Sequence, residues 1–215
     1  MIKGAIFDID GTILDSMPFW YDIGKQYLES IGIEPEEGLS DRVFALSLND
    51  GAKYINEHYK LNKTKEEVIS GITDIVFDSY RHKIQLKSGA GQFLKKLKSE
   101  NIPMCIATAG DIRYLDAAFK RLDISEIFDE IFTCTQFDTN KNEPYIYLKA
   151  AESLGCDISE IYVFEDAFQA AKTAKDAGFN VVGVYDKAYD NCKEEMKNVS
   201  DIFINDFYDD RLNDL

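Results

Sequence analysis

The sequence GAIFDIDGT, residues 4–12, joins an apolar, strand-like run to two acids spaced two apart and a Gly-Thr turn. In an extended strand, residues two apart point to the same side, so Asp8 and Asp10 are expected together at the strand's carboxyl end. Gly11 permits the chain to turn sharply away. Two carboxylates in that place can bind a hard cation, but Asp-Gly is also ordinary turn chemistry at a strand end. From this stretch alone both interpretations stand.

Five more β-branched or aromatic runs follow, and helical patterns separate the later ones. A strand, helix, strand alternation predicts a parallel sheet that is covered by helices on both faces and connected by right-handed crossovers. The predicted fold class is therefore α/β, with three α/β/α layers. Strands are expected at residues 4–9, 103–108, 130–134, 161–165, 180–184 and 201–205.

The segment from residue 17 to 87 breaks this alternation. It contains amphipathic helical patterns and no convincing strand, so it is expected to form a helical cap inserted after the first strand. The sheet-bearing core would then comprise residues 1–16 and 88–215. Open α/β sheets bind ligands beyond the carboxyl ends of their strands, and an insertion at that point is expected to cover such a site.

Composition excludes several classes of partner. Acids outnumber Lys and Arg by 39 to 24, the formal charge is −15, and no run of Lys or Arg exceeds two residues, so nucleic acid is not expected to bind. No apolar run approaches the ~20 residues of a membrane span, and no signal peptide is recognised. The cysteines form no CxxC pair and are expected to be reduced packing residues, which favours a cytoplasmic location. They are Cys105, Cys134, Cys156 and Cys192.

Three further segments place polar groups where predicted strands end. Thr108, with the backbone N–H groups of Ala109 and Gly110, is suited to holding a phosphate oxygen, although the same turn, with Asp111 as N-cap, is an ordinary helix start. Lys141 precedes a predicted helix and can place an ammonium on an anion, although a lone Lys in a polar loop is usually solvated.

The fourth strand ends in Glu165-Asp166. These adjacent acids are expected to cap an alanine-rich helix, and acids near a helix N-terminus are ordinary partners of the helix dipole. Together with the two earlier segments and the first aspartates, they give polar groups in a consistent order at four strand ends. That order favours a shared site over four unrelated turns.

The series DIDGT, Thr108, Lys141 and Glu165-Asp166 resembles the four motifs of the haloacid dehalogenase-like superfamily, in the branch of β-phosphoglucomutases and small-molecule phosphatases. The resemblance covers essentially the whole chain, including the position of the helical cap, and implies a Rossmann-like core. Two stretches depart from the family pattern. Lys-Pro-x-Pro-Asp is replaced by Lys-Asn-Glu-Pro-Tyr at residues 141–145, and the usual Glu-Asp-Ser by a triplet ending in Ala167, with Ala170 where a glycine is usual. The charged residues are retained.

The resemblance implies a phosphatase that uses Mg²⁺. Asp8 would be the nucleophile that forms an aspartyl-phosphate, while Asp10 would protonate the leaving oxygen and then activate water. Mg²⁺ would be held by the side chains of Asp8 and Asp166 and by the backbone carbonyl of Asp10, with Glu165 nearby or bound through water.

The phosphoryl oxygens would be held by Thr108, the N–H groups after it, including that of Ala109, and Lys141. The expected substrate is a small phosphorylated molecule such as a sugar phosphate. Neither histidine is expected to take part, because His58 and His82 both fall within the expected cap.

Two other functions remain open at this stage. A β-phosphoglucomutase would pass the phosphoryl group to a second hydroxyl of a bound sugar, but polar residues that such mutases carry appear here as Trp20, Phe44 and Leu48. The phosphatase is therefore favoured. A non-catalytic binding or regulatory protein on the same fold would be expected to lose Asp8 or Asp10, and both are present. Other residues of the expected cap that are candidates for facing a substrate are Arg42, Lys53 and Tyr54.

Overall fold

The structure is a computed structural model that describes residues 2–215, and the chain folds into two compact units. One unit contains residues 2–15 together with Gln85–Leu215, and the other contains Ser16–Ile84. The first unit carries the sheet and the second is helical. The chain leaves and re-enters the first unit at neighbouring points, because the Asp15 N–H donates to the Gln85 carbonyl (2.9 Å) and Leu14 pairs with Leu86 in an antiparallel bridge.

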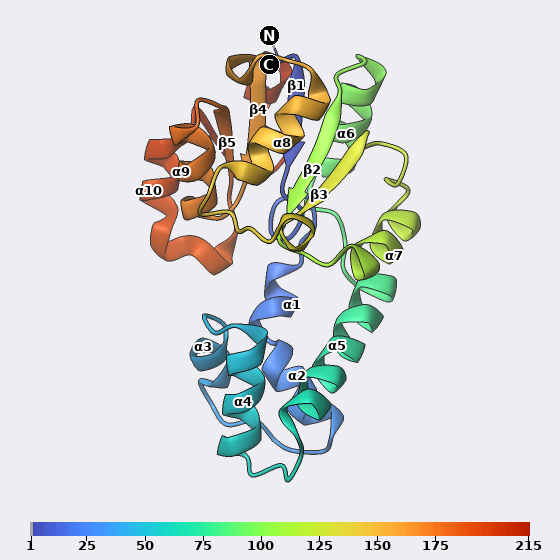
Figure 1. The fold of residues 1–215 in the computed structure, drawn as a ribbon, viewed down its shortest axis with the longest axis vertical. Coiled ribbons are helices and arrows are strands. Elements are labelled where there is room, and N and C mark those ends of the chain that lie inside the picture. The colour runs from blue at the N-terminus through green and yellow to red at the C-terminus, as the bar shows by residue number, and fades with distance from the viewer. Residues whose placement is uncertain (1) are drawn as a thin grey trace. The chain divides into compact units, whose positions relative to one another are not determined.

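Six parallel strands form the sheet, in the order β3-β2-β1-β4-β5-β6 (Figure 1). The six sequence runs that predicted strands all form one, so the α/β prediction is confirmed. The chain builds outward from β1 through β2 to β3, then returns to the other side of β1 with β4. This reversal brings the carboxyl ends of β1 and β4 side by side, which is where such sheets bind ligands. The strands are β1 (Gly4–Phe7), β2 (Met104–Thr108), β3 (Glu130–Thr133), β4 (Ile161–Glu165), β5 (Asn180–Val184) and β6 (Ile202–Ile204).

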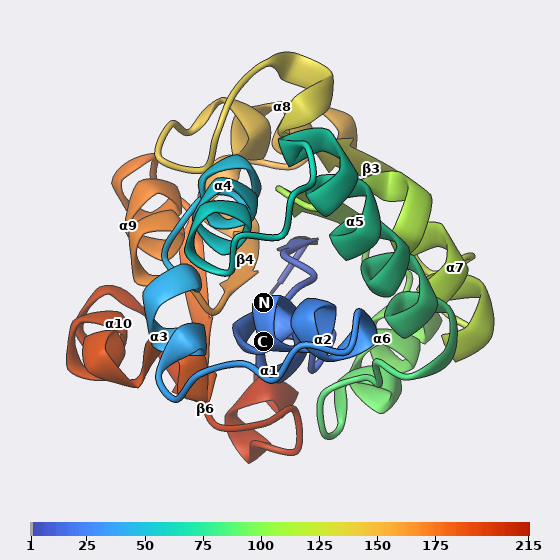
Figure 2. The ribbon, with the colours of Figure 1, turned by 90° about the horizontal axis from the view of Figure 1, so that it is seen from below.

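One face of the sheet is covered by α8 (Tyr145–Leu154), α9 (Phe168–Asp176) and α10 (Lys193–Val199). Their small and aliphatic residues pack with alternate strand residues such as Ile6 and Val163 in one buried cluster. Figure 2 shows these three helices on one side of the strands and α6 and α7 on the other.

The opposite face carries α6 (Ala90–Ser99) and α7 (Ile112–Leu122). Its core is aromatic. Phe7 of β1 stacks on Phe164 of β4 with ring centroids 4.4 Å apart, and Phe93 of α6 packs on both rings. Because helices cover both faces of the sheet, the strands are mostly apolar, and the three-layer architecture follows.

The helical unit consists of α1 (Met17–Tyr21), α2 (Ile23–Ser30), α3 (Leu39–Val43), α4 (Leu48–His58) and α5 (Lys65–His82). The longest of these, α5, packs on α2 and α4 through buried residues that include Ile72. Gly71 of α5 allows close contact, because a Cβ at that position would lie 2.6 Å from a ring carbon of Tyr27. Thr64 begins α5 with a capping box, in which its hydroxyl and the Glu67 carboxylate each accept a backbone N–H.

Short 3₁₀ turns complete the chain at Thr135–Phe137, Ile158–Glu160, Lys187–Cys192 and Asp210–Asn213. Within residues 2–215 the four cysteines are unpaired, as predicted. Among the same residues, no helix is both long enough and apolar enough to cross a membrane.

Candidate active site

The chain turns sharply where β1 ends, and this turn positions the first two acids. Asp8 is buried, and its N–H donates to the Phe164 carbonyl of β4 (3.0 Å), which fixes the end of one strand against the other. Gly11 has a φ of +82°, a backbone conformation that favours glycine, and its N–H donates to the Leu14 carbonyl. The predicted glycine turn after Asp10 is confirmed.

Three buried acids converge at the ends of β1 and β4. Asp8, Glu165 and Asp166 each offer a carboxylate oxygen, and these oxygens all lie within 4.8 Å of one another. Asp166 Oδ1 accepts a hydrogen bond from the Thr12 hydroxyl (3.1 Å), while Asp166 Oδ2 is buried with no hydrogen-bond partner among residues 2–215. Clustered carboxylates with an unpartnered buried oxygen fit a hard divalent cation such as Mg²⁺, which prefers oxygen ligands.

Lys141 joins this cluster from the loop before α8. Its ammonium contacts Asp8 Oδ1 and donates to Glu165 Oε1 (2.6 Å), and its side chain is only 13% exposed. The lysine that the sequence placed in a polar loop is therefore a buried partner of two site acids. The phenol of Tyr147, on α8, donates to the same Glu165 oxygen (2.7 Å).

The electrostatics of the metal-free site reflect this crowding of charge. Burial, together with the charge of Asp8, raises the pKa of Glu165 to about 7, even though Lys141 opposes the shift. Burial and the charges of Asp8 and Glu165 raise the pKa of Asp166 well above its usual range. Burial disfavours the charged form of Lys141, but the neighbouring acids outweigh it, and the pKa of Lys141 is raised. A divalent cation would relieve the repulsion among these acids.

The loop after β2 lies beside Asp10. Thr108 is buried, and its hydroxyl accepts the Gly110 N–H (2.9 Å), so in this conformation that N–H bonds within the loop. A Cβ at Gly110 would lie 3.1 Å from Asp10 Oδ2, so the glycine makes room for the acid. Asp111 caps α7 by accepting the Arg113 N–H, as predicted.

One prediction from the sequence is wrong. Glu165 and Asp166 do not cap α9, whose N-cap is Ala167 without a side-chain hydrogen bond. The reason lies in the partners of the two acids: Lys141 bonds to the first and Thr12 to the second. Their oxygens are directed to the site instead of to the helix N-terminus.

The structure adds residues that the sequence did not identify. Thr12 and Tyr147 contact site acids directly, as described above. Asp186, after β5, lines a small cavity together with Asp166 and forms a buried ion pair with Lys87 (2.8 Å). In the sequence, Tyr147 has the spacing of a core residue of a helix, so nothing marks it as a site residue. Lys87 and Asp186 lie far apart in the sequence, so their pairing is identified only from the fold.

The residues proposed for the cap lie in the helical unit. The Trp20 indole N–H donates to the Tyr80 hydroxyl (2.8 Å), which makes it partly a structural residue. Phe44 is half-buried, whereas Leu48 is 45% exposed. Of the others, Arg42 pairs with Glu36, Tyr54 stacks on His58 with centroids 5.1 Å apart, and Lys53 is exposed.

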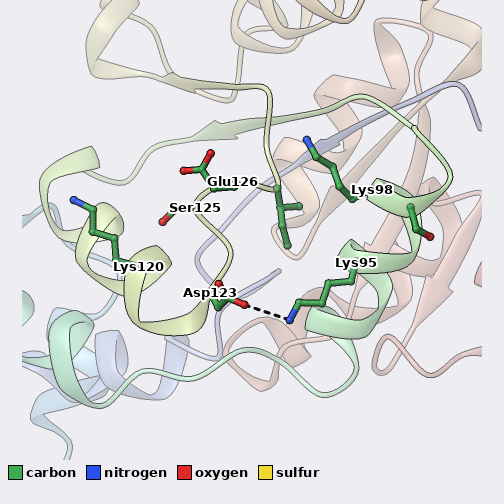
Figure 3. Close-up of a pocket in the computed structure, with 8 residues that line it drawn as sticks. Lys95, Lys98, Lys120, Asp123, Ser125 and Glu126 are labelled. Carbon is green, nitrogen blue, oxygen red and sulfur yellow. Dashed lines mark ion pairs between the residues drawn. The ribbon is translucent and has the colours of Figure 1, made fainter.

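A cavity of about 550 Å³ lies elsewhere, beside the carboxyl-terminal ends of α6 and α7 (Figure 3). Three lysines line it, and each faces an acid: Lys95 lies 3.6 Å from Asp123, while Lys98 and Lys120 pair with Asp129 and Asp116. These pairs neutralise most of the positive charge, and none of the predicted site residues lines the cavity. The convergence of acids at β1 and β4 is therefore the better candidate for a functional site.

Comparison with known proteins finds relatives along most of the chain. A phosphorylated carbohydrates phosphatase of Thermotoga maritima is 25% identical over 177 residues, which are 82% of each chain. A β-phosphoglucomutase of Bacillus subtilis is 27% identical over 199 residues, covering 85% of this chain and 83% of the relative. The solved structure of CbbY from Rhodobacter sphaeroides in complex with phosphate is 18% identical and superposes over all of both chains with a TM-score of 0.77, which shows a shared fold.

The family model described as haloacid dehalogenase-like hydrolase matches residues 5–184, which run from the second residue of β1 to the end of β5 and include every acid of the cluster. The match covers most of the chain. This protein therefore belongs to the haloacid dehalogenase-like hydrolase family.

Proposed function

We propose that this protein is a Mg²⁺-dependent phosphatase that hydrolyses a small phosphate monoester through an aspartyl-phosphate on Asp8. The observation that carries the proposal is the buried cluster of Asp8, Glu165 and Asp166, bridged by Lys141 at the carboxyl end of the sheet. Buried acids are costly unless they are paired or hold a metal, and here three acids share a single lysine and a few hydroxyl donors.

The metal would be held by Asp8 and Asp166 through their side chains and by Asp10 through its backbone carbonyl, with Glu165 nearby or bound through water. The unpartnered Asp166 Oδ2 supports this assignment, because a buried carboxylate oxygen is otherwise expected to accept a hydrogen bond. When bound, the cation supplies positive charge that lets an anionic carboxylate approach an anionic phosphate.

In the first half of the reaction, a carboxylate oxygen of Asp8 forms a bond to phosphorus while the bond from phosphorus to the alcohol oxygen breaks. Asp10, protonated at this stage, gives its proton to the departing oxygen. The products are the free alcohol and a phosphoryl group on Asp8. The place of Asp10 two residues beyond the nucleophile, directly before the Gly11 turn, supports these two roles.

In the second half, Asp10 is a carboxylate and removes a proton from water. The water oxygen forms a bond to phosphorus, the bond from phosphorus to Asp8 breaks, and inorganic phosphate leaves. Both aspartates return to their starting states. The Thr108 hydroxyl, the Ala109 N–H and the Lys141 ammonium would hold the phosphoryl oxygens in both halves, where charge is redistributed.

The names of the relatives support a small phosphorylated substrate. The Thermotoga maritima relative is named for phosphorylated carbohydrates, and a relative from Escherichia coli is a hexitol phosphatase. We infer a sugar or polyol phosphate as the substrate class. The excess of acids over bases in the sequence gives no support for a nucleic-acid partner.

The decisive experiment is phosphate release from p-nitrophenyl phosphate and from a panel of sugar and polyol phosphates, with Mg²⁺ or with EDTA. Wild-type protein is expected to release phosphate only with the metal. Asp8→Asn is expected to abolish turnover, whereas Asp10→Asn should keep the fold and Mg²⁺ binding and lose about 10²- to 10⁴-fold in kcat. The assignment as a phosphatase is wrong if the wild type releases no phosphate from any substrate.

The similarity to a β-phosphoglucomutase makes a sugar-phosphate mutase the alternative. Such an enzyme would transfer the phosphoryl group from Asp8 to a second hydroxyl of a bound sugar instead of to water. Conversion of β-glucose 1-phosphate to glucose 6-phosphate without net release of phosphate would establish the mutase in place of the phosphatase.

A further inference from the structure

Tyr147 is a buried tyrosine that the proposed reaction does not use. It lies on α8, its relative exposure is 0%, and its ring packs edge-on against Phe179 with centroids 6.3 Å apart. A phenylalanine would fill the same space in the core. Its hydroxyl therefore needs an explanation of its own.

That hydroxyl donates to Glu165 Oε1 (2.7 Å), the same oxygen that accepts the Lys141 ammonium (2.6 Å). A carboxylate oxygen accepts about two hydrogen bonds, so these two donors saturate Oε1. The other oxygen of Glu165 is then the one left for a metal or a metal-bound water. The two donors fix the Glu165 carboxylate, which is one of the three acids of the buried cluster.

The surroundings make this hydrogen bond strong. Glu165 is 1% exposed, and a hydrogen bond to a charged, buried carboxylate contributes more than one between neutral groups. Without the Tyr147 hydroxyl, Lys141 would be the one side-chain donor to Oε1 among residues 2–215, and Lys141 is shared with Asp8. Because the Tyr147 phenol also donates to Glu165, the Lys141 ammonium can be shared between Glu165 and Asp8.

We propose that Tyr147 is a positioning residue for the metal site: its hydroxyl fixes the Glu165 carboxylate, and through it the position of Lys141 between Glu165 and Asp8. This proposal rests on the proposed function only in naming Mg²⁺ as the cation. It assigns Tyr147 no contact with substrate. Groups that orient metal-binding residues typically change metal affinity about 10- to 100-fold when they are removed.

The test is Tyr147→Phe, which removes one oxygen and retains the buried ring. Mg²⁺ affinity, measured by isothermal titration calorimetry on purified protein, is expected to fall about 10- to 100-fold. With a phosphatase substrate, the Mg²⁺ concentration for half-maximal activity should rise in parallel, while kcat at saturating Mg²⁺ should recover to within a few-fold of wild type.

The matched control is Tyr145→Phe on the same helix. Tyr145 is 43% exposed, so removing its hydroxyl should leave Mg²⁺ affinity unchanged. A second control is a double-mutant cycle with Glu165→Ala: if Tyr147 acts through Glu165, adding Tyr147→Phe to Glu165→Ala should cause no further loss of affinity.

Three results would overturn the proposal: unchanged Mg²⁺ affinity in folded Tyr147→Phe, additive losses in the cycle, or loss of the circular dichroism of the fold, which would make the hydroxyl structural. Failure of the proposed function is a separate outcome. If the wild type hydrolyses no phosphate ester but Tyr147→Phe still weakens Mg²⁺ binding, the positioning role stands and the reaction must be reassigned.

Discussion

At the scale of single residues, the site depends on how closely backbone and acids approach each other. Asp10 sits against the loop after β2, where Gly110 leaves a space that a side chain would occupy. The Thr108 hydroxyl would also lie close to a side chain there, 3.2 Å from the position of a Cβ. A methyl group at Gly110 would therefore crowd both Asp10, the proposed acid-base residue, and Thr108, which is proposed to hold a phosphoryl oxygen.

Gly110→Ala is expected to lower kcat about 10- to 100-fold with little change in Mg²⁺ affinity, because a shift of Asp10 misplaces the proton transfer. Steady-state kinetics and metal titration measure the two effects separately. Gly51→Ala is the control, since nothing lies within 4 Å of a Cβ there and activity should not change. Wild-type kcat in Gly110→Ala would show that the space beside Asp10 is not needed.

The residues of the site differ in how visible they are in sequence. Asp8, Asp10, Thr108 and the acids at the end of β4 lie at the ends of predicted strands, and Lys141 lies in the loop before a predicted helix. The general rule about strand ends therefore brings them together. Tyr147 gives no such signal, because helical spacing explains it as core. A role for its hydroxyl becomes visible only in the folded chain, where Tyr147 donates a hydrogen bond to Glu165 at the end of β4.

At the scale of secondary-structure elements, a buried ion pair between Lys87 and Asp186 joins the segment just before α6 to the segment after β5. The Lys87 ammonium donates to Asp186 Oδ2 and to the Tyr185 carbonyl, both at 2.8 Å, and Asp186 Oδ1 accepts the Ala188 N–H. The side chains of Lys87 and Asp186 are 10% and 4% exposed. The pair is therefore nearly shielded from water.

Lys87→Met is expected to destabilise the fold by about 3–5 kcal/mol, because it leaves Asp186 buried and uncompensated. Urea denaturation of the metal-free protein measures the loss. Adding Asp186→Asn, which retains an oxygen for the cap, should recover part of it. Lys95→Met is the matched control at an exposed pair, with an expected cost of less than about 1 kcal/mol. Equal losses in the two lysine variants would contradict the prediction.

The positions of the strands could be predicted from the sequence, but the order of the strands in the sheet could not. A strand covered on both faces is mostly apolar, so β1, β4 and β5 stand out in the sequence as β-branched and aromatic runs. Strand order depends on pairing between segments far apart in the chain. The Lys87–Asp186 pair follows from that order, and local sequence patterns therefore could not show it.

At the scale of the whole molecule, protons and metal compete for the same acids. In the metal-free fold the pKa of Glu165 is raised to about 7, and the pKa of Asp166 is raised well above its ordinary range. A raised carboxyl pKa means that the folded chain holds a proton that the unfolded chain releases. For Glu165 the resulting stabilisation is complete below about pH 4, the ordinary carboxyl range, and is lost as the pH rises through about 7.

Mg²⁺ binds the ionised acids, so bound Mg²⁺ is expected to stabilise the fold at the higher pH values at which these acids have lost their protons. The rise in Tm on adding saturating Mg²⁺ is expected to be small at about pH 5.5 and larger at about pH 8. Differential scanning fluorimetry at both pH values checks this expectation, with Asp166→Asn as the control in which the dependence should flatten. The same rise in Tm at both pH values would contradict competition between metal and protons.

The hydrogen bond from Asp15 to Gln85 and the bridge between Leu14 and Leu86 hold together the two points at which the chain leaves and re-enters the sheet-bearing unit. The helical unit is a loop whose base is closed by bonds inside the sheet-bearing unit. Closing a loop costs only about 0.6 kcal/mol more for each doubling of its length, so an insertion of this size costs only a few kcal/mol more to close than a short turn. Selection can lengthen, shorten or rewrite the helical unit while the strands that carry the acids keep their pairing.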